Sequence, residues 1–442
     1  LIDWDQDAEA IGAFARALDF GGYVNPMGLP KILAGGLPAA VMGVDILTQS
    51  AGAHPGTVLE ISEERLVVAA RDGRVALTNL STLEGRPLSI MDYARATKLE
   101  TGGRLAQFSP DEARRLTEVH SGLVRHEDYW IQKLSRINPL HIPYRKHARE
   151  EGGSRRFETF VFPVPEDIQE YVKTLEIPVP VAEFILTAFG AWLARITGAA
   201  EFDIGYSDSS LARRIQGFEK FHAAQTPLRF TLDPQRTFSE NLAASLDELK
   251  AVRRRQTYAR DILARYPQVR EVTESGYDAG LPVAVEWGQE MNGHGAGPGT
   301  YFLFVLNEDG TECRWLYDPR ILDSANLEDM RRQFAIFLQG LARHPDWPVA
   351  RLPILSEEET RRILFDWNTT QTEYPREDCI HDQFEAQVER TPDAAAVVFQ
   401  DQEWSYRELN RRANQVARYL RKQGVGPDIL VGVHMERSLE MM

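Results

Sequence analysis

The sequence predicts a multidomain protein in which a small β unit is followed by α/β units. The chain has 442 residues, more than the roughly 100 to 200 residues of an ordinary domain. Short strand-like runs with a tight turn occupy its N-terminal part, whereas longer helical and strand-like runs alternate after them. A polar stretch over residues 366–376 then separates a last helix and strand pattern from the rest.

The composition is that of a soluble globular protein, with 43% apolar and 26% charged residues. A net charge of −15 argues against a phosphate-binding surface spread over the chain. The two cysteines, Cys313 and Cys379, supply no disulfide framework, so we expect a reducing, cytoplasmic setting. No run reaches the ~18 apolar residues that span a bilayer. Because the chain starts at Leu1 without a leader pattern, we expect it to be cut from a longer protein.

Residues 1–103 predict a small barrel-like domain. Asp7 is placed to cap a helix that Gly21-Gly22 end. The apolar residues of this helix fall on one face: Ile11, Phe14, Ala15 and Leu18. Strand-like runs follow at residues 58–61, 65–70 and 74–80. Asp72-Gly73 supplies the positive φ of a tight hairpin between the last two runs.

Residues 104–365 predict an α/β unit. Ser109 and Glu112 form a helix start. The run from Val181 to Ile196 is apolar almost all round, so we expect a buried core helix. The other predicted elements are strands at residues 202–206, 226–230, 281–286 and 301–307, and helices at 238–255 and 327–342.

Residues 377–442 predict the opening βαβ part of a further α/β domain. An apolar run over residues 394–399 and a turn at Asp401-Gln402 precede a helix that reaches residue 423. Ser405 lies three residues before Glu408, a spacing that lets each side chain satisfy a backbone N–H at the helix start. The run Ile429–Val433 is predicted as the next strand.

The N-terminal unit resembles the C-terminal domain of methionyl-tRNA formyltransferases and of related sugar and peptide-synthetase formyltransferases. The resemblance is carried by Ile2-Asp3-Trp4, Asn25-Pro26, Gly28-Leu29-Pro30-Lys31 and the stretch LEISEERLVVAARDGRVALTNL. It implies that folate binding and the catalytic Asn, His and Asp belong to a preceding domain. Residues 1–103 contain eight Lys and Arg against thirteen Asp and Glu. This balance weighs against docking to tRNA.

The rest of the chain resembles the junction of a condensation and an adenylation domain in nonribosomal peptide synthetases. The match starts at Tyr129-Trp130 and is strongest in three motifs: Leu352-Pro353-Ile354-Leu355-Ser356, Trp367-Asn368-Thr369-Thr370 with Tyr374-Pro375, and Trp404-Ser405-Tyr406-Arg407-Glu408-Leu409. It implies a condensation-type (chloramphenicol acetyltransferase-like) lobe before the linker.

The sequence also departs from the condensation family. The catalytic His-His-x-x-x-Asp-Gly motif is missing from the chain. Lys220–Ala224 stands where members carry Gly-x-x-Val-Asn, and Arg255–Ala259 stands where they carry His-Gln-x-x-Pro. We therefore expect the fold of the lobe without condensation chemistry.

Three candidate sites are interpreted as structural features. Gly293–Gly299 has no Lys-Ser or Lys-Thr after it and precedes a strand, so it predicts a hairpin loop and no phosphate loop. Arg253-Arg254-Arg255 point in different directions on a helix, which favours a solvated face over binding of phosphate on a carrier-protein arm. Asp203 has no second carboxylate or His at a readable spacing and is not assigned to catalysis.

The histidines and cysteines are also interpreted as structural residues. His120 and His126 have no Cys or third His nearby, so no metal site is predicted from them. Cys379 lies close to His381, but this spacing does not create a nucleophile and base pair, and a structural thiol is predicted. We thus predict no catalytic, cofactor-binding or metal-binding residue in this chain.

These resemblances define a domain plan for a stretch of a nonribosomal peptide synthetase. Residues 1–103 are a formyltransferase C-terminal-like domain, 104–365 the C-terminal lobe of a condensation domain, 366–376 a linker, and 377–442 the start of an adenylation (AMP-binding) domain. The formyltransferase-like unit is expected to pack where the missing condensation lobe would lie.

The resemblance implies that the whole protein activates an amino acid with ATP and Mg²⁺ as an acyl adenylate. The amino acid is then loaded on the phosphopantetheine arm of a carrier-protein domain. An upstream formyltransferase-like domain would formylate it, with 10-formyltetrahydrofolate as donor. The region in hand is expected to position domains and to bind no cofactor, nucleic acid or membrane. Two alternatives stay open: a non-catalytic docking module for the carrier protein, and a tRNA-docking domain.

Overall fold

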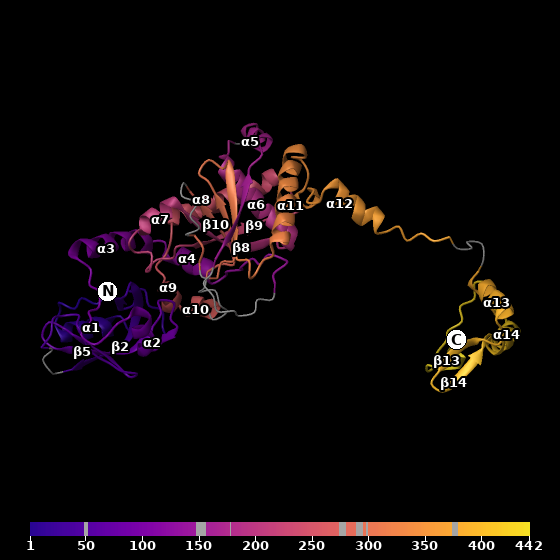
Figure 1. Cartoon of the computed structure of the whole chain (residues 1–442), viewed down its shortest axis with the longest axis horizontal. Helices are drawn as coiled ribbons and strands as arrows, with labels where there is room; N and C mark the ends of the chain where they lie inside the picture. Colours follow the sequence, from indigo (N-terminus) through magenta and orange to yellow (C-terminus); the bar gives the residue numbers. More distant parts are fainter. Residues whose placement is uncertain are drawn as a thin grey trace. The chain divides into compact units, whose positions relative to one another are not determined.

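A computed structural model describes residues 1–47, 52–146, 156–176, 178–273, 280–288, 295–297, 299–373 and 379–442. The chain divides into a first unit, Leu1–Glu357, and a second unit, Glu358–Met442. Figure 1 follows each unit by sequence colour. The described helices include none that is long and apolar enough to cross a membrane.

The first unit begins with an antiparallel sheet and two helices. The strand order is β1 (Lys31–Ala34), β2 (Leu37–Leu47), β5 (Arg74–Ser81), β4 (Leu66–Ala69) and β3 (Val58–Ile61), with β6 (Pro87–Leu88) paired to β5. Helix α1 (Ala8–Ala17) packs on β2, and α2 (Ile90–Thr97) contributes Tyr93 to the same buried core. The sequence analysis missed β1 and β2, which are joined by Gly35 and Gly36 with φ of 51° and 73°.

The start of α1 differs in detail from the expected cap. Asp7 occupies the N-cap position, but its carboxylate accepts a hydrogen bond from Arg71 Nε at 2.9 Å. The backbone N–H of Ala8 instead donates to Asp72 Oδ1 at 2.9 Å. The helix therefore starts where the sequence predicts it, while a residue of the β4–β5 turn supplies the capping oxygen.

The remainder of the first unit is an α/β layer built on a mixed sheet. Its strand order is β7 (Glu158–Pro163), β12 (Glu312–Tyr317), β11 (Phe302–Leu306), β10 (Val283–Trp287), β8 (Glu201–Asp208) and β9 (Thr226–Thr231). Strands β8, β10 and β11 run parallel, and the other pairs are antiparallel. The helices are α3 (Pro110–Val124), α4 (Glu127–Leu134), α5 (Glu166–Lys173), α6 (Val181–Thr197), α7 (Ser209–Ile215), α8 (Phe238–Arg255), α9 (Ile262–Arg265), α10 (Pro267–Thr273) and α11 (Ser324–Arg343), followed by a short 3-10 turn, Val349–Arg351 (Figure 1).

Helix α6 lies in the main core, as its apolar sequence predicts. Phe189 of α6 stacks on Phe304 of β11 with ring centroids 4.1 Å apart, and Trp192 packs against Trp315 and Phe334. Gly198 ends the helix in the left-handed conformation at φ 75°. These aromatic contacts join the helix to the sheet through apolar burial.

The first unit has two parts, the antiparallel sheet with α1 and α2 (the β part) and the mixed sheet with its helices (the α/β part). They share a small apolar cluster. Ala40 and Leu83 of the β part lie with Val119 and Leu123 of α3 and with Phe218 and Phe221 of the α/β part. The expected adjacency of the two parts is thus present. The boundary near residue 104 stays a prediction, since both parts belong to one compact unit.

The second unit is small and open. It contains Arg362–Asp366, α13 (Ile380–Arg390), β13 (Ala395–Phe399), β14 (Gln402–Ser405), α14 (Tyr406–Lys422) and a short turn, Leu439–Met441; α12 (Glu357–Arg361) leads into it. The two strands form a hairpin. Among the residues described in this unit, only Leu439 is buried.

Two local expectations in this unit need correction. Ser405 accepts a hydrogen bond from Glu408 N as predicted, but the Glu408 carboxylate pairs with Arg411 and Arg412 on its own helix. The predicted strand Ile429–Val433 is irregular in the described chain, and Leu430 is 99% exposed. A strand needs a hydrogen-bonding partner, and no described strand of this unit pairs with the run.

Candidate functional site

A concave surface of the first unit lies at the carboxyl ends of β8 and β10. Cavities of about 250 Å³ and 710 Å³ share Asp208, Ser209, Leu211, Arg213, Trp287 and Glu308. A third cavity, of about 220 Å³, shares Glu219 and Ala224 with the second. We call the three together the β8–β10 groove and the third the junction cavity. Ligand sites of open α/β sheets favour this edge.

Asp208 is the fixed anion of the groove. It ends β8 and caps α7, because its Oδ1 accepts a hydrogen bond from Leu211 N at 2.7 Å. The Tyr206 hydroxyl donates to Asp208 Oδ2 at 2.8 Å and accepts from Arg253 Nε at 2.8 Å. Burial and the neighbouring carboxylate raise the pKa of Tyr206, so its hydroxyl stays protonated.

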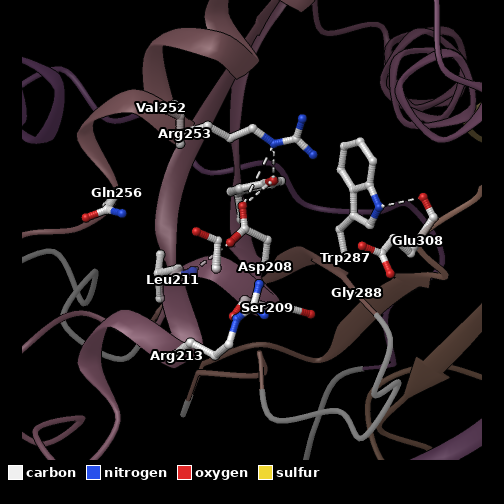
Figure 2. Close-up of a pocket in the computed structure, with 12 residues that line it drawn as sticks. Asp208, Ser209, Leu211, Arg213, Val252, Arg253, Gln256, Trp287, Gly288 and Glu308 are labelled. Atoms are coloured by element: carbon white, nitrogen blue, oxygen red, sulfur yellow. Dashed lines mark hydrogen bonds and ion pairs between the residues drawn. The ribbon is translucent and has the colours of Figure 1, made fainter.

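Arg253 covers the aromatic wall of the groove, as Figure 2 shows. Its guanidinium lies 3.8 Å from the centre of the Trp287 ring, a cation–π arrangement. A second nitrogen donates to Glu183 Oε1 of α6 at 2.8 Å. Trp287 Nε1 donates to the Glu308 carbonyl at 3.4 Å. This part of the groove is a preorganised polar and aromatic surface suited to binding.

The lining of the two larger cavities contains hydroxyl and carboxylate side chains. The described residues that line the two larger cavities include Ser207, Ser209 and Ser210, but no His and no Cys. Asp208 is already engaged by Tyr206 and by the helix N-terminus. The aromatic and charged contacts of Arg253, Trp287 and Asp208 are therefore the best-defined features of this surface.

The two segments that depart from the condensation pattern meet at the junction cavity. His222 pairs with Ala259 in an isolated antiparallel bridge, and Ala223 N donates to Tyr258 O at 3.0 Å. His222, Ala223, Ala224 and Tyr258 line the cavity together with Glu84 of the β part. The sequence analysis did not single out His222, although the departure at Lys220–Ala224 marked its position.

A buried ionic network holds the β part to the α/β part. Asp261 accepts from Lys31 Nζ at 2.5 Å and from Arg265 Nε at 3.1 Å. Burial opposes the ionisation of Asp261, but the charges of Lys31 and Arg265 outweigh it and hold its pKa below the usual value. Arg265 also donates to Asn25 O at 2.9 Å and pairs with Glu127.

A second ion pair crosses the same boundary. Arg260 Nε donates to Glu84 Oε1 at 2.7 Å. The Glu84 side chain is largely buried while that of Arg260 is partly exposed. With the Asp261 network and the shared apolar cluster, the pair makes this boundary a packed interface.

Asp203 and the arginine run have structural partners. Asp203 is fully buried and accepts from Arg229 Nε at 3.1 Å, from Arg229 Nη2 at 2.8 Å and from Asn138 N at 2.8 Å. Arg255 lies 4.0 Å from the Tyr129 ring centre. With Arg253 over Trp287, only Arg254 of the three is exposed. The arginines diverge as predicted, but two of them make internal contacts where a solvated face was expected.

Other predicted candidates remain apart. His120 is half-buried near the junction, where burial lowers its pKa, whereas His126 precedes α4. Among the described residues no metal-binding group contains either histidine. In the glycine-rich loop, Gly293, His294 and Pro298 lie outside the described residues. Gly295 N donates to Glu286 Oε2 at 3.1 Å, and β11 follows as a strand.

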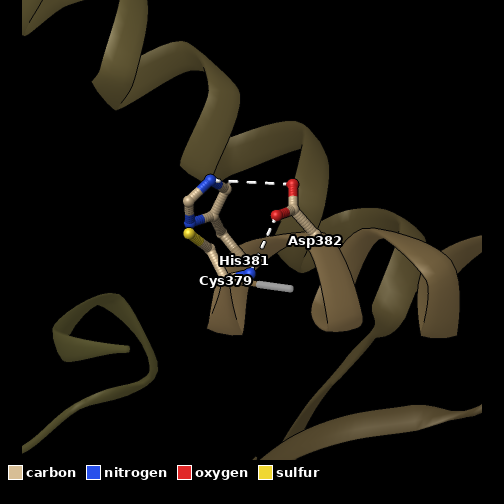
Figure 3. Close-up of side chains that lie close together, drawn as sticks. All are labelled: Cys379, His381 and Asp382. Atoms are coloured by element: carbon tan, nitrogen blue, oxygen red, sulfur yellow. Dashed lines mark hydrogen bonds and ion pairs between the residues drawn. The ribbon is translucent and has the colours of Figure 1, made fainter. Parts of the chain in front are cut away.

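Cys379 and His381 lie at the start of α13 with Asp382, which the sequence analysis did not name (Figure 3). One ligand atom from each residue lies within 4.8 Å of the others, and all three residues are exposed. Asp382 Oδ2 accepts from Cys379 N at 3.0 Å. Functional metal ligands are held by a supporting shell of hydrogen bonds. These exposed side chains are oriented mainly by their own helix turn, so we assign no metal to them.

Comparison with known proteins identifies both ends of the chain. Residues 1–98 match the family model of the formyl transferase C-terminal domain. Residues 384–442 match the model of AMP-binding enzymes. These matches confirm the two resemblances that the sequence motifs carried at the ends of the chain.

Curated relatives cover the middle as well. A linear gramicidin synthase of Brevibacillus parabrevis is 34% identical in a 347-residue alignment that covers 72% of this chain and 4% of that protein. Gramicidin S synthase 2 of Brevibacillus brevis is 46% identical over 126 residues, 28% of this chain and 3% of that protein. The chain thus spans only a few per cent of the length of these relatives.

The fold has a solved counterpart. A crystal structure of the nonribosomal peptide synthetase FmoA3 matches with a TM-score of 0.53 at 21% identity, over 82% of this chain and 41% of that chain. At this identity the match establishes the fold alone. It confirms the predicted fold class.

Proposed function

We propose that this chain, whose sequence is that of a nonribosomal peptide synthetase, serves mainly to position domains around a carrier-borne amino acid. The whole protein would activate that amino acid with ATP and Mg²⁺ and load it on a phosphopantetheine arm. A formyltransferase-like catalytic domain would then formylate its amine, with 10-formyltetrahydrofolate as donor. The α/β part, which lacks the His-His-x-x-x-Asp-Gly motif, would act as a platform and form no peptide bond.

The observation that carries this proposal is the packed interface between the β part and the α/β part. Asp261, Lys31 and Arg265 are joined by short hydrogen bonds in a buried setting. A buried charge that loses its partner is strongly destabilising, so this interface has one preferred geometry. A fixed geometry is what a platform requires, because reacting groups must be held close and in orientation.

Carrier docking through the arginine run has less support. Arg253 and Arg255 face aromatic rings of this chain, which leaves Arg254 as the exposed cation of the run. One exposed positive side chain provides little electrostatic attraction for an acidic partner. Docking to tRNA is opposed by the excess of acidic residues in the N-terminal part.

The test uses the ion pair between Glu84 and Arg260 in the full-length synthetase. Glu84→Arg places two cations in contact and should loosen the interface, whereas the double change Glu84→Arg with Arg260→Glu restores opposite charges. We expect Glu84→Arg to lower formylation of the loaded amino acid and to leave ATP–pyrophosphate exchange unchanged. The double variant should recover formylation. Normal formylation by Glu84→Arg, with limited proteolysis showing a loosened interface, would reject the positioning role.

A further inference from the structure

The turn between β5 and β6 contacts the α/β part through three successive residues, Leu83, Glu84 and Gly85, which we call the junction turn. We propose that the junction turn is the element by which the β part recognises the α/β part, whose surface accepts an apolar residue, an acidic residue and a glycine in that order. The inference rests on the proposed function, because it takes a defined junction to be what positions the domains. It adds the residues that make the pairing selective.

Leu83 is the apolar residue of the junction turn. It is 2% exposed although it lies in a connecting segment, where side chains usually face water. The core of the β part includes Leu80 before the turn and Leu88 after it, but Leu83 does not belong to that core. It lies instead in the shared cluster with Phe218 and Phe221 of the α/β part. Separating the two parts would expose this leucine, so its burial favours the paired state.

Glu84 pairs with a cation that the α/β part holds in place. Its largely buried carboxylate accepts a hydrogen bond from Arg260 Nε at 2.7 Å. A second nitrogen of the same guanidinium, Nη1, donates to Lys220 O at 3.3 Å. A buried charge that loses its partner is strongly destabilising. The pair therefore favours a turn with an acidic residue at this position over a turn with a neutral or basic one.

Gly85 allows the junction turn to approach the α/β part closely. Its φ of 92° lies in the left-handed region that favours glycine. A Cβ at this position would lie 3.0 Å from Ala264 Cβ and 3.3 Å from Ala264 Cα, closer than the ~3.5–4.0 Å of an ordinary contact between carbon atoms. The fit thus requires a glycine in the turn and a small residue on α9.

The surface that receives the turn is formed by α9 and by the two segments that depart from the condensation pattern. Residues 220–224 and 256–260 are joined by an isolated antiparallel bridge. Arg260 N donates to Phe221 O at 2.9 Å, so the apolar and the cationic contact of the turn are held next to each other. The departure from the condensation pattern therefore coincides with the surface that binds the β part.

The experiment follows hydrogen exchange at Asn25 in the 442-residue chain, because Asn25 N donates across the junction to Arg265 O at 3.0 Å. The combined change Leu83→Ser and Glu84→Ser removes two contacts of the turn and keeps Gly85. We expect exchange at Asn25 to become at least about ten times faster, because a buried leucine and a buried ionic partner are lost. Amides of β2 and β5 should keep their protection, since these strands belong to the separate core of the β part.

Two further variants complete the test. Met42→Ser combined with Glu63→Ser is the matched control, since it changes an exposed apolar residue and an exposed glutamate of the β part. It should leave exchange at Asn25 within about twofold of the unmodified chain. Ala264→Val changes the receiving surface and leaves the β part intact. Overpacking against Gly85 should then speed exchange at Asn25 at least about fivefold.

Unchanged exchange at Asn25 after the double change in the turn would show that the turn does not determine the pairing. Loss of protection in β2 and β5 as well would assign the turn to folding of the β part, which also rejects the inference. If the double variant does not fold, Ala264→Val decides, and unchanged exchange at Asn25 rejects the fit at Gly85. A double variant that opens the junction but formylates normally in the full-length synthetase would support the recognition and reject the positioning role.

Discussion

Asp261 shows how one side chain can determine the association of two domains. It is 2% exposed and lies between a cation of the β part, Lys31, and one of its own part, Arg265. In such a setting each ion is stable only while its partners remain in place. No sequence spacing relates Lys31 to Asp261, so this contact could not be predicted before the fold was known.

Replacing Asp261 by Ala should destabilise the first unit by about 3–5 kcal/mol, because it leaves Lys31 without its carboxylate partner and Arg265 with Glu127 alone. Urea unfolding followed by tryptophan fluorescence measures the change. Glu60→Ala is the control, since Glu60 and Arg65 form an exposed pair worth about 0–1 kcal/mol. A loss below about 1 kcal/mol for Asp261→Ala would show that the network is not structurally important.

Acidification gives a second prediction at residue scale. Burial lowers the pKa of His222 and of the nearby His120, in a region that also contains Lys31 and Asp261. Each histidine thus binds a proton more readily when unfolded, where its pKa is about 6.5. The free energy of unfolding should therefore fall as the pH is lowered from 7 to 5. His222→Gln should flatten this dependence, and an unchanged slope would contradict the assignment.

At the scale of elements, local patterns predicted what local interactions determine. The range Phe238–Arg255 of α8 and the helix start at Ser109 agree with the structure, because caps and apolar periodicity act within one helix. The Ile429–Val433 strand failed because a strand depends on a neighbour distant in sequence. Sequence patterns did not predict the groove either, because its walls come from β8, β10 and α8, which are distant in sequence.

Helix α6 packs closely on β9 at Gly190, so a larger side chain there should disturb the contact. A Cβ at Gly190 would lie inside the contact distance of the Phe230 ring, which is itself buried. Gly190→Ala should therefore destabilise the first unit by about 1–3 kcal/mol through overpacking, more than the ~1 kcal/mol that Ala gains in a helix. Gly22→Ala is the control, because nothing lies within 4 Å of its added carbon. Urea unfolding compares the two, and equal stability would mean that the ring can move aside.

At the scale of the molecule, the two units differ in how they are stabilised. The first unit has a large core that includes Trp130, Trp192 and Trp315. The described part of the second unit buries one side chain, Leu439, and exposes Ile380 and Leu430. Because apolar burial is the main stabilising term in folding, the second unit depends on local hydrogen bonds and ion pairs.

Hydrogen exchange should make this contrast visible. Amides of α6 and β11 are expected to exchange only through global unfolding of the first unit, whereas those of α13 and α14 should exchange through local opening. The expected order follows from burial, since α6 is enclosed on most sides and neither α13 nor α14 contains a buried side chain. Ser405→Ala should speed exchange in α14 further, because it removes the acceptor for Glu408 N and costs the helix about 1 kcal/mol. Protection in α14 equal to that in α6 would mean that contacts beyond those described stabilise the second unit.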